Sequence, residues 1–168
     1  MPDKKEIVIN TGPIIALVAA LGDLSILRSL YHRLLVPHEV CQEVQAGGPN
    51  GFAVNEFEDA SWLQKWPDPL DIAPILINSL DIGEASVIQL ALNEKIRTVC
   101  IDEPRGRCIA RLSGLSLTGS IGILLRAKRE GNPISIQGAI QRMQQRGVWL
   151  SESVIAFVVK EAGKEKKE

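Results

Sequence analysis

The chain has 168 residues, of which 45% are hydrophobic and 23% are charged, a normal balance for a globular protein with one sizeable core. Lysine and arginine total 19 against 20 aspartates and glutamates, so no global positive field attracts nucleic acid and any such contact must be local. The longest purely apolar run, residues 13–21, is far shorter than the roughly 20 residues of a membrane span. The polar start at 1–6 has no signal-peptide pattern, so we expect a cytoplasmic protein without membrane contact.

Cysteine and histidine usage argues against sites built on these two residue types. Cys41, Cys100 and Cys108 are an odd number without CxxC spacing, which predicts reduced, structural thiols. His32 and His38 lie near the second predicted strand, where a surface or core role is favoured. Phosphate-binding glycine loops and the nucleophile elbow are absent from the sequence, so nucleotide-cofactor enzymes and serine hydrolases have no support.

Strand and helix patterns alternate along the first half of the chain. Residues 6–9 form a short β-branched run that stops before Gly12 and Pro13, which predicts a strand, a tight turn and a helix at 14–21. The next predicted elements are a helix from Asp23, a strand at 33–36, a helix from Pro37, a loop with a little irregular structure at 47–69 and a helix at 72–80.

The second half continues the alternation and ends in helices. The clearest helix begins at Asp81 and runs to about Lys95. It is followed by a predicted strand at 97–101, a helix at 103–112, a strand at 115–117 and a helix at 119–130, whose inward residues should be Ile121, Leu124 and Leu125. Two C-terminal helices come next, one with Ile136, Ile140 and Met143 on one face and one from Ser151 with Val154, Ile155, Val158 and Val159. Residues 164–168 should form a solvated tail. Apolar strands between helices predict an α/β fold with a parallel sheet covered on both faces. We expect a single domain, 1–168, with a core at about 6–130 and C-terminal helices at about 134–163.

Polar residues follow three of the predicted strands. In an open parallel sheet, ligands bind outside the carboxyl ends of the strands, so these residues should meet at one crevice. They are Asn10 and Thr11, then Asp102 and Glu103, then Thr118 and Ser120. Glu84, in the first turn of its helix, shares the face of Ile88 and Ala91 that packs on the sheet. The sequence therefore predicts a carboxylate beside the same crevice.

Each candidate also has a purely structural interpretation, and taken singly both interpretations stay open. The structural alternatives are a capping box (Asp81 with Glu84), a helix cap (Asp102), a turn (Asn10 with Thr11) and a solvated helix face (Glu43 with Glu39). Their coincidence at strand ends favours a metal site. The basic residues on the two helices after Asp102 and Thr118 can contact phosphates or form a solvated face; they are Arg105, Arg107, Arg111, Arg126, Lys128 and Arg129.

Five segments in a fixed order carry a resemblance to a known superfamily. They are IVINTGPIIAL from position 7, VPHEVCQEV from 36, DIGEASVIQLAL from 81, TVCIDEPRGRCIARLSGLSLTGSIGILLRAK from 98 and GVWLSES from 147. Together they cover nearly the whole chain, residues 7–159. They resemble an uncharacterised, mostly prokaryotic branch of the PIN-like superfamily.

The resemblance implies a three-layer α/β/α sandwich with a central parallel sheet. It also implies a site of about four acidic residues that binds Mg²⁺ or Mn²⁺ and hydrolyses RNA. By position these four residues are Asn10, Glu43, Glu84 and Asp102, with Thr11, Glu103, Thr118 and Ser120 lining the pocket and Arg105 and Arg107 available to RNA. Such nucleases form homodimers and are silenced by a small antitoxin protein, so the resemblance implies these partners too.

Asn10 departs from this pattern, because an amide oxygen can ligate a cation but brings no charge and cannot act as a base. Two hypotheses remain open. The first is a divalent-metal-dependent endoribonuclease, which in one form would be the toxin of a toxin–antitoxin pair. The second is a catalytically weak or inactive PIN-like module that binds nucleic acid or protein. A phosphoryl-transfer enzyme with an aspartyl nucleophile is disfavoured, since the first strand ends in asparagine.

Overall fold

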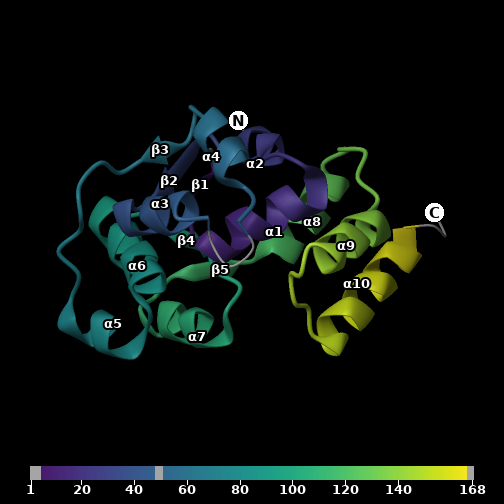
Figure 1. Cartoon of the computed structure of the whole chain (residues 1–168). Coiled ribbons are helices and arrows are strands. Elements are labelled where there is room, and N and C mark those ends of the chain that lie inside the picture. Colours follow the sequence, from purple (N-terminus) through teal and green to yellow (C-terminus); the bar gives the residue numbers. More distant parts are fainter. Residues whose placement is uncertain (1–4, 48–50, 166–168) are drawn as a thin grey trace.

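The computed structural model describes residues 5–47 and 51–165 and contains a five-stranded parallel sheet in the order β3-β2-β1-β4-β5 (Figure 1). The strands are β1 (Glu6–Ile9), β2 (Arg33–Val36), β3 (Gln64–Lys65), β4 (Thr98–Cys100) and β5 (Ser116–Thr118). The polar start at 1–4, part of the predicted loop at 48–50 and the tail at 166–168 lie outside the described residues. Within the described ranges, no helix combines the length and the apolar character that crossing a membrane requires.

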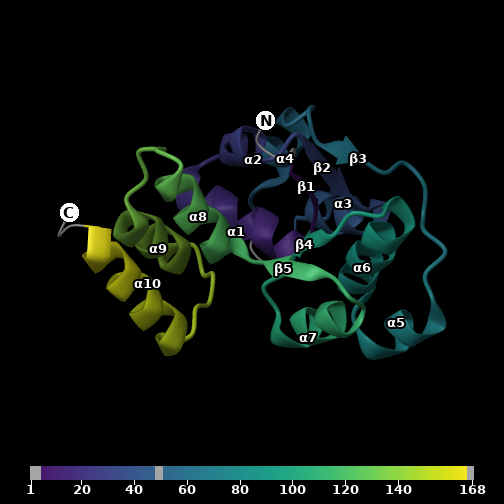
Figure 2. The same cartoon turned by 180° about the vertical axis from the view of Figure 1, so that it is seen from behind.

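Helices cover both faces of the sheet, as Figures 1 and 2 show from opposite sides. They are α1 (Thr11–Leu21), α2 (Ser25–Leu30), α3 (His38–Gln45), α4 (Val54–Asp59), α5 (Pro74–Ser79), α6 (Ile82–Glu94), α7 (Pro104–Leu112), α8 (Ser120–Arg129), α9 (Ile136–Gln145) and α10 (Glu152–Glu165). Helix α6 packs on β1 and β4 and α7 packs on β5, whereas α1 packs against α8 and α9. This is the α/β/α sandwich that the sequence predicted.

Helix α1 explains why the chain needs its C-terminal helices. Almost every residue of α1 is buried, so the helix is apolar all round and must be covered on more than one side. Helix α9 supplies part of this cover with the predicted face of Ile136, Ile140 and Met143, all buried. Arg142 of α9 also donates from Nε to the carbonyl oxygen of Ala20, at 2.6 Å. The C-terminal helices therefore complete the core of the sheet domain.

The strand order places a switch point between β1 and β4. From β1 the chain proceeds to β2 and β3 on one side of the sheet, and it then crosses to β4 and β5 on the other. The two strands are in register through Val8 with Val99 and Ile9 with Cys100, and the Asn10 amide donates to the Cys100 carbonyl at 3.1 Å. Ligands bind in doubly wound sheets at the carboxyl ends of the strands that flank such a switch.

Three details of the predicted elements are wrong. The predicted loop at 47–69 contains α4, with Phe57 fully buried, and the edge strand β3. Two residues are too few to show a strand pattern, and β3 exists because its backbone pairs with β2. In α8 the inward residues are Ile123, Leu124 and Ala127, whereas the predicted Ile121 and Leu125 are only half-buried. In α10 the predicted Val158 is buried, but Val159 is exposed.

Candidate functional site

Asn10 stands at the carboxyl end of β1 with an unsatisfied amide oxygen. The residue is 6% exposed and occupies the N-cap position of α1, but its side chain makes no capping hydrogen bond. Its Oδ1 is buried and has no hydrogen-bond partner among the described residues. Because nearly all buried polar atoms in native proteins are paired, this atom points to a donor or cation that the described residues do not supply.

Glu43 of α3 lies beside the same strand end. Its Oε2 accepts a hydrogen bond from Thr11 Oγ1 at 2.6 Å. Burial raises the pKa of the Glu43 carboxyl and the charge of Asp81 raises it further, while the hydrogen bonds from Thr11 and from the Gly83 backbone lower it. The alternative of a solvated helix face is wrong, because Glu43 is half-buried and Glu39 is buried and accepts from the Leu70 amide at 2.8 Å.

Glu84 carries the most perturbed carboxylate of the site. The residue is 5% exposed, and burial first, then the charges of Asp81, Glu103 and Glu43, raises its pKa to about 7 against a smaller opposing effect of Arg105. The predicted cap is present, since the Glu84 amide donates to Asp81 Oδ1 at 2.9 Å. The Glu84 side chain lies instead at a cavity of about 510 Å³, which Glu103 and Arg105 also line.

Asp102 follows β4 and is held by the protein itself. Its Oδ1 accepts a hydrogen bond from the Ser120 amide at 2.8 Å, so Asp102 caps α8 rather than the helix that follows it in the sequence. Although Asp102 as a residue is exposed, the packing around its carboxylate raises its pKa, and the hydrogen bonds from Ser120 and the charge of Arg107 lower it. Asp102 therefore has part of its charge compensated without any ligand.

A glycine lies against each of the three carboxylates, a feature that the sequence analysis missed. A Cβ at Gly83 would lie 2.8 Å from Glu43 Oε2, one at Gly106 would lie 3.2 Å from Glu84 Cδ, and one at Gly119 would lie 2.6 Å from Asp102 Oδ1. Each carboxylate therefore occupies space that a side chain would fill. The glycines of the DIGE, PRGR and LTGS strings were the available signal.

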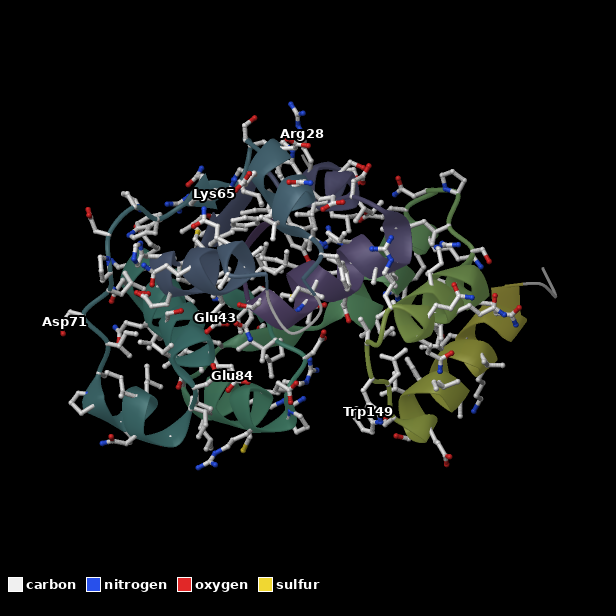
Figure 3. All side chains as sticks on the ribbon, in the orientation of Figure 1. Arg28, Glu43, Lys65, Asp71, Glu84 and Trp149 are labelled. Atoms are coloured by element: carbon white, nitrogen blue, oxygen red, sulfur yellow. The ribbon has the colours of Figure 1, made fainter. Side chains whose placement is uncertain are left out.

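The predicted site residues fall into two groups. The charge of Glu43 contributes to the raised pKa of Glu84, and Figure 3 shows both residues at the junction of α3, α6 and α7. Asp102 lies with Ser120, Arg107 and Thr118 at the ends of β4 and β5. In the described part of the chain, three or more histidine, cysteine, aspartate or glutamate residues nowhere come together as a metal-binding group. The oxygen types that a hard cation takes are nevertheless present at this edge of the sheet, in the carboxylates of Glu43 and Glu84 and in the amide of Asn10.

The arginines expected near the substrate have different surroundings. Arg105 lines the cavity in front of Glu84. Arg107 donates from Nη1 to the carbonyl oxygens of Ile101 at 2.8 Å and Thr118 at 3.2 Å, so it ties the ends of β4 and β5 together. Arg126 lies 4.9 Å over the Tyr31 ring and donates to the Leu30 carbonyl, which assigns it to packing rather than to the site.

Comparison with known proteins supports the same scaffold. The family model described as DUF3368: PIN domain matches residues 6–164, which include every strand and all the candidate residues. No curated protein matches the chain. PIN domains form a nuclease-type superfamily and generally use divalent metals. The chain therefore belongs to the PIN domain family DUF3368.

Proposed function

We propose that this protein is a divalent-metal-dependent ribonuclease of PIN type, with Asn10, Glu43, Glu84 and Asp102 as its catalytic site. The observation that carries the proposal is the buried, unpartnered Oδ1 of Asn10 at the carboxyl end of β1. The family class, which points to a nucleic-acid substrate, supports it. So does the raised pKa of Glu84, because strongly perturbed carboxylates in a cavity gather at functional sites.

The buried amide oxygen of Asn10 and the two half-buried or buried carboxylates beside it support Mg²⁺ or Mn²⁺ as the ion. Asn10 Oδ1 and the carboxylates of Glu43 and Glu84 would hold the ion, since hard cations take oxygen ligands and keep several waters. Such an ion supplies Lewis-acid stabilisation of the charge that develops on a phosphodiester and lowers the pKa of a water molecule.

The protein's own contribution is to orient and charge these groups. Thr11 holds the Glu43 carboxylate through its 2.6 Å hydrogen bond. Glu84, which its pKa of about 7 leaves partly protonated near neutral pH in the metal-free protein, would give up this proton because a neighbouring cation favours the carboxylate. Asp102, fixed by the Ser120 amide, contributes its charge at the neighbouring strand end.

A second candidate function is a PIN-like module that binds RNA or protein without cutting. Asn10 favours it, because the amide leaves the site one charge short at the first position. The absence of a three-residue acidic group among the described residues favours it as well. The two candidates share the pocket and differ in whether a divalent ion enables hydrolysis.

Cleavage of a mixed single-stranded RNA pool in Mn²⁺ separates the two candidates. We expect the wild type to cleave, and Glu84→Ala and Asp102→Ala to lose roughly 100-fold or more in rate, as when a transition-state contact is removed. Glu58→Ala, which changes an exposed acid on α4, is the matched control and should keep the full rate. Absence of cleavage by the wild type, or undiminished cleavage by both site variants, would leave the binding module as the function.

Asn10→Asp tests whether the asparagine at the first acidic position of the PIN pattern limits the site. The added carboxylate should tighten Mn²⁺ binding and raise the cleavage rate, while the metal-free protein loses stability because a charge is buried at a 6% exposed site. If Mn²⁺ affinity does not rise, Asn10 is not part of the ion site.

On the basis of the resemblance we also propose two partners for this protein, a second copy of the chain in a homodimer and a small antitoxin protein that silences its activity. The structure offers a surface for such contacts where α5 and the start of α6 expose Ile75, Ile77 and Ile82. Exposed apolar side chains mark interaction sites where they form a contiguous patch. Light scattering after gel filtration, with Ile75→Glu as the disrupting variant, measures the dimer.

A further inference from the structure

A second cleft of about 590 Å³ opens beside the candidate site, between the strand ends and the connection from α9 to α10. Its polar side is formed by Asp102, Thr118 and Ser120. Its apolar side includes Trp149 and Phe157. Figure 3 shows Trp149 at the start of α10, on the side turned toward α7. The cleft therefore joins the proposed catalytic edge to the C-terminal helices, and its volume is that of a small-molecule pocket, about 300–1,000 Å³.

Packing within the chain does not explain why Trp149 is so exposed. Its side chain is 83% exposed, and Phe157 one and a half turns into α10 is 52% exposed. The two neighbours of Trp149 in the sequence, Val148 and Leu150, pack against the core and anchor the connection. Trp149 thus buries little apolar surface within the chain and is held outward by residues that do. Exposed aromatic side chains lining a cleft are typical of binding surfaces.

Two glycines keep the polar side of the cleft open. A Cβ at Gly119 would lie 2.6 Å from Asp102 Oδ1, and one at Gly122 would lie 2.8 Å from Thr118 Oγ1. With these side chains absent, the carboxylate and the hydroxyl border the cleft directly. Arg107 lines it too, but its Nη1 donates to two carbonyl oxygens of the strand ends.

The lining selects the kind of group that fits. The acids Asp102 and Glu103 both border the cleft and repel a phosphate, so a charged backbone group is a poor occupant. A flat, neutral group with hydrogen-bonding edges matches an aromatic wall opposite hydroxyl and carboxylate oxygens. Unpaired RNA bases are recognised in this way, by stacking on aromatic rings and hydrogen bonding along their edges.

We infer that the cleft binds an unpaired nucleobase of single-stranded RNA, stacked on Trp149 and with its edge toward Thr118 and Asp102. The inference rests on the proposed ribonuclease function for the identity of the polymer. Because Asp102 and Ser120 belong both to the cleft and to the candidate site, the bound base belongs to a nucleotide next to the phosphodiester that is cut. Trp149 then determines preference for single strands, since a paired base cannot enter.

Binding of a short fluorescein-labelled, single-stranded oligoribonucleotide tests the inference, measured by anisotropy in EDTA so that nothing is cleaved. Base–aromatic stacking predicts that Trp149→Ala weakens binding roughly 5- to 100-fold, whereas Trp149→Phe stays within about threefold of wild type. Leu112→Ala is the matched control, because Leu112 is 79% exposed on α7 and does not line the cleft. Thermal unfolding of all variants checks that the fold is intact.

The same oligonucleotide with abasic positions separates the base from the backbone. Trp149→Ala should have no effect on the binding of this strand, since the stacking partner is missing. Three results would overturn the inference. Trp149→Ala would bind the RNA as tightly as the wild type, or it would lose as much affinity for the abasic strand as for the normal strand, or the wild type would not bind RNA at all. RNA binding that depends on Trp149 without cleavage in Mn²⁺ retains the cleft and rejects the nuclease, and the reverse result retains the nuclease and rejects the cleft.

Discussion

Glu84 and Asp102 are carboxylates at the ends of the same sheet, but the protein treats their charges differently. The Glu84 charge is desolvated and surrounded by the further negative charges of Asp81, Glu103 and Glu43. Asp102 accepts a hydrogen bond from the Ser120 amide and lies near the positive charge of Arg107. The protein therefore supplies Asp102 with a hydrogen-bond donor and a nearby positive charge, whereas the negative charge of Glu84 must be compensated by a cation or a proton.

The contrast assigns different work to the two halves of the site. In the proposed function, the half made by Asn10, Glu43 and Glu84 depends on a bound cation, because among the described residues only Arg105 opposes the negative charge at Glu84, and weakly. The half made by Asp102 and Ser120 is organised before any ion arrives, since Asp102 also caps α8. Four predictions test this division, beginning with the largest expected effect.

The pH dependence of Mn²⁺ affinity should come from Glu84. Its pKa of about 7 means that binding must displace a proton at lower pH, so affinity rises by up to about tenfold per pH unit below 7 and levels off above it. Calorimetric titration of Mn²⁺ across this range measures the slope. Glu84→Gln should weaken binding and flatten the slope, while Asp102→Asn should keep it. A slope unchanged in Glu84→Gln would place the titrating group elsewhere.

The stability of the metal-free protein should depend on the same group with the opposite sign. The folded pKa of about 7 lies above the ordinary 4.5, so the folded state binds more protons between these values and stability falls as the pH rises through them. Glu84→Gln removes this loss and should stabilise the protein at pH 8 by about 3 kcal/mol, roughly 6–12 °C in Tm, with no gain near pH 4. Asp102→Asn should gain less, because Ser120 and Arg107 offset its burial. Equal gains for the two variants in thermal scans would contradict the contrast.

Gly83→Ala should move the Glu43 carboxylate without unfolding the protein. The new Cβ would lie 2.8 Å from Glu43 Oε2, and the end of a flexible side chain can shift away. We expect about tenfold weaker Mn²⁺ binding, with stability held or raised because alanine favours helices over glycine by up to about 1 kcal/mol. Gly12→Ala is the matched control in α1, since a Cβ there has nothing within 4 Å. An equal loss of affinity in both variants would mean that Glu43 does not bind the ion.

Thr11→Val should have the smallest effect. It removes the 2.6 Å hydrogen bond to Glu43 Oε2, which costs about 1 kcal/mol of stability and raises the pKa of Glu43 further. Chemical denaturation and Mn²⁺ titration measure both consequences. Thr98→Val, in β4 at the far end of that strand, serves as control and should change neither by a comparable amount. Full Mn²⁺ affinity in Thr11→Val would show that Glu43 needs no positioning by the hydroxyl.

Local patterns were sufficient for the central elements of the fold. The β-branched run at β1, the short apolar run at β2 and the cap at Asp81 predict their elements because the signal is contained in neighbouring residues. Strand β3 could not be predicted, because its two residues become a strand only by pairing with β2. Likewise Asp102 looked like a cap for the next helix, and only the folded sheet brings it to the amide of Ser120.

The sequence by itself determined the alternation of strands and helices, the resemblance to PIN domains and the residue types at the strand ends, because each of these depends on residues that are close together in the sequence. The tertiary structure decided the charge state of these residues and the cleft beside them. Burial, the three glycines and the neighbouring charges around Glu84 come from segments far apart in sequence. The wall that contains Trp149 likewise reaches the strand ends only when α9 and α10 complete the core. Electrostatic energy and cavity shape depend on distances through space, which the order of residues does not contain.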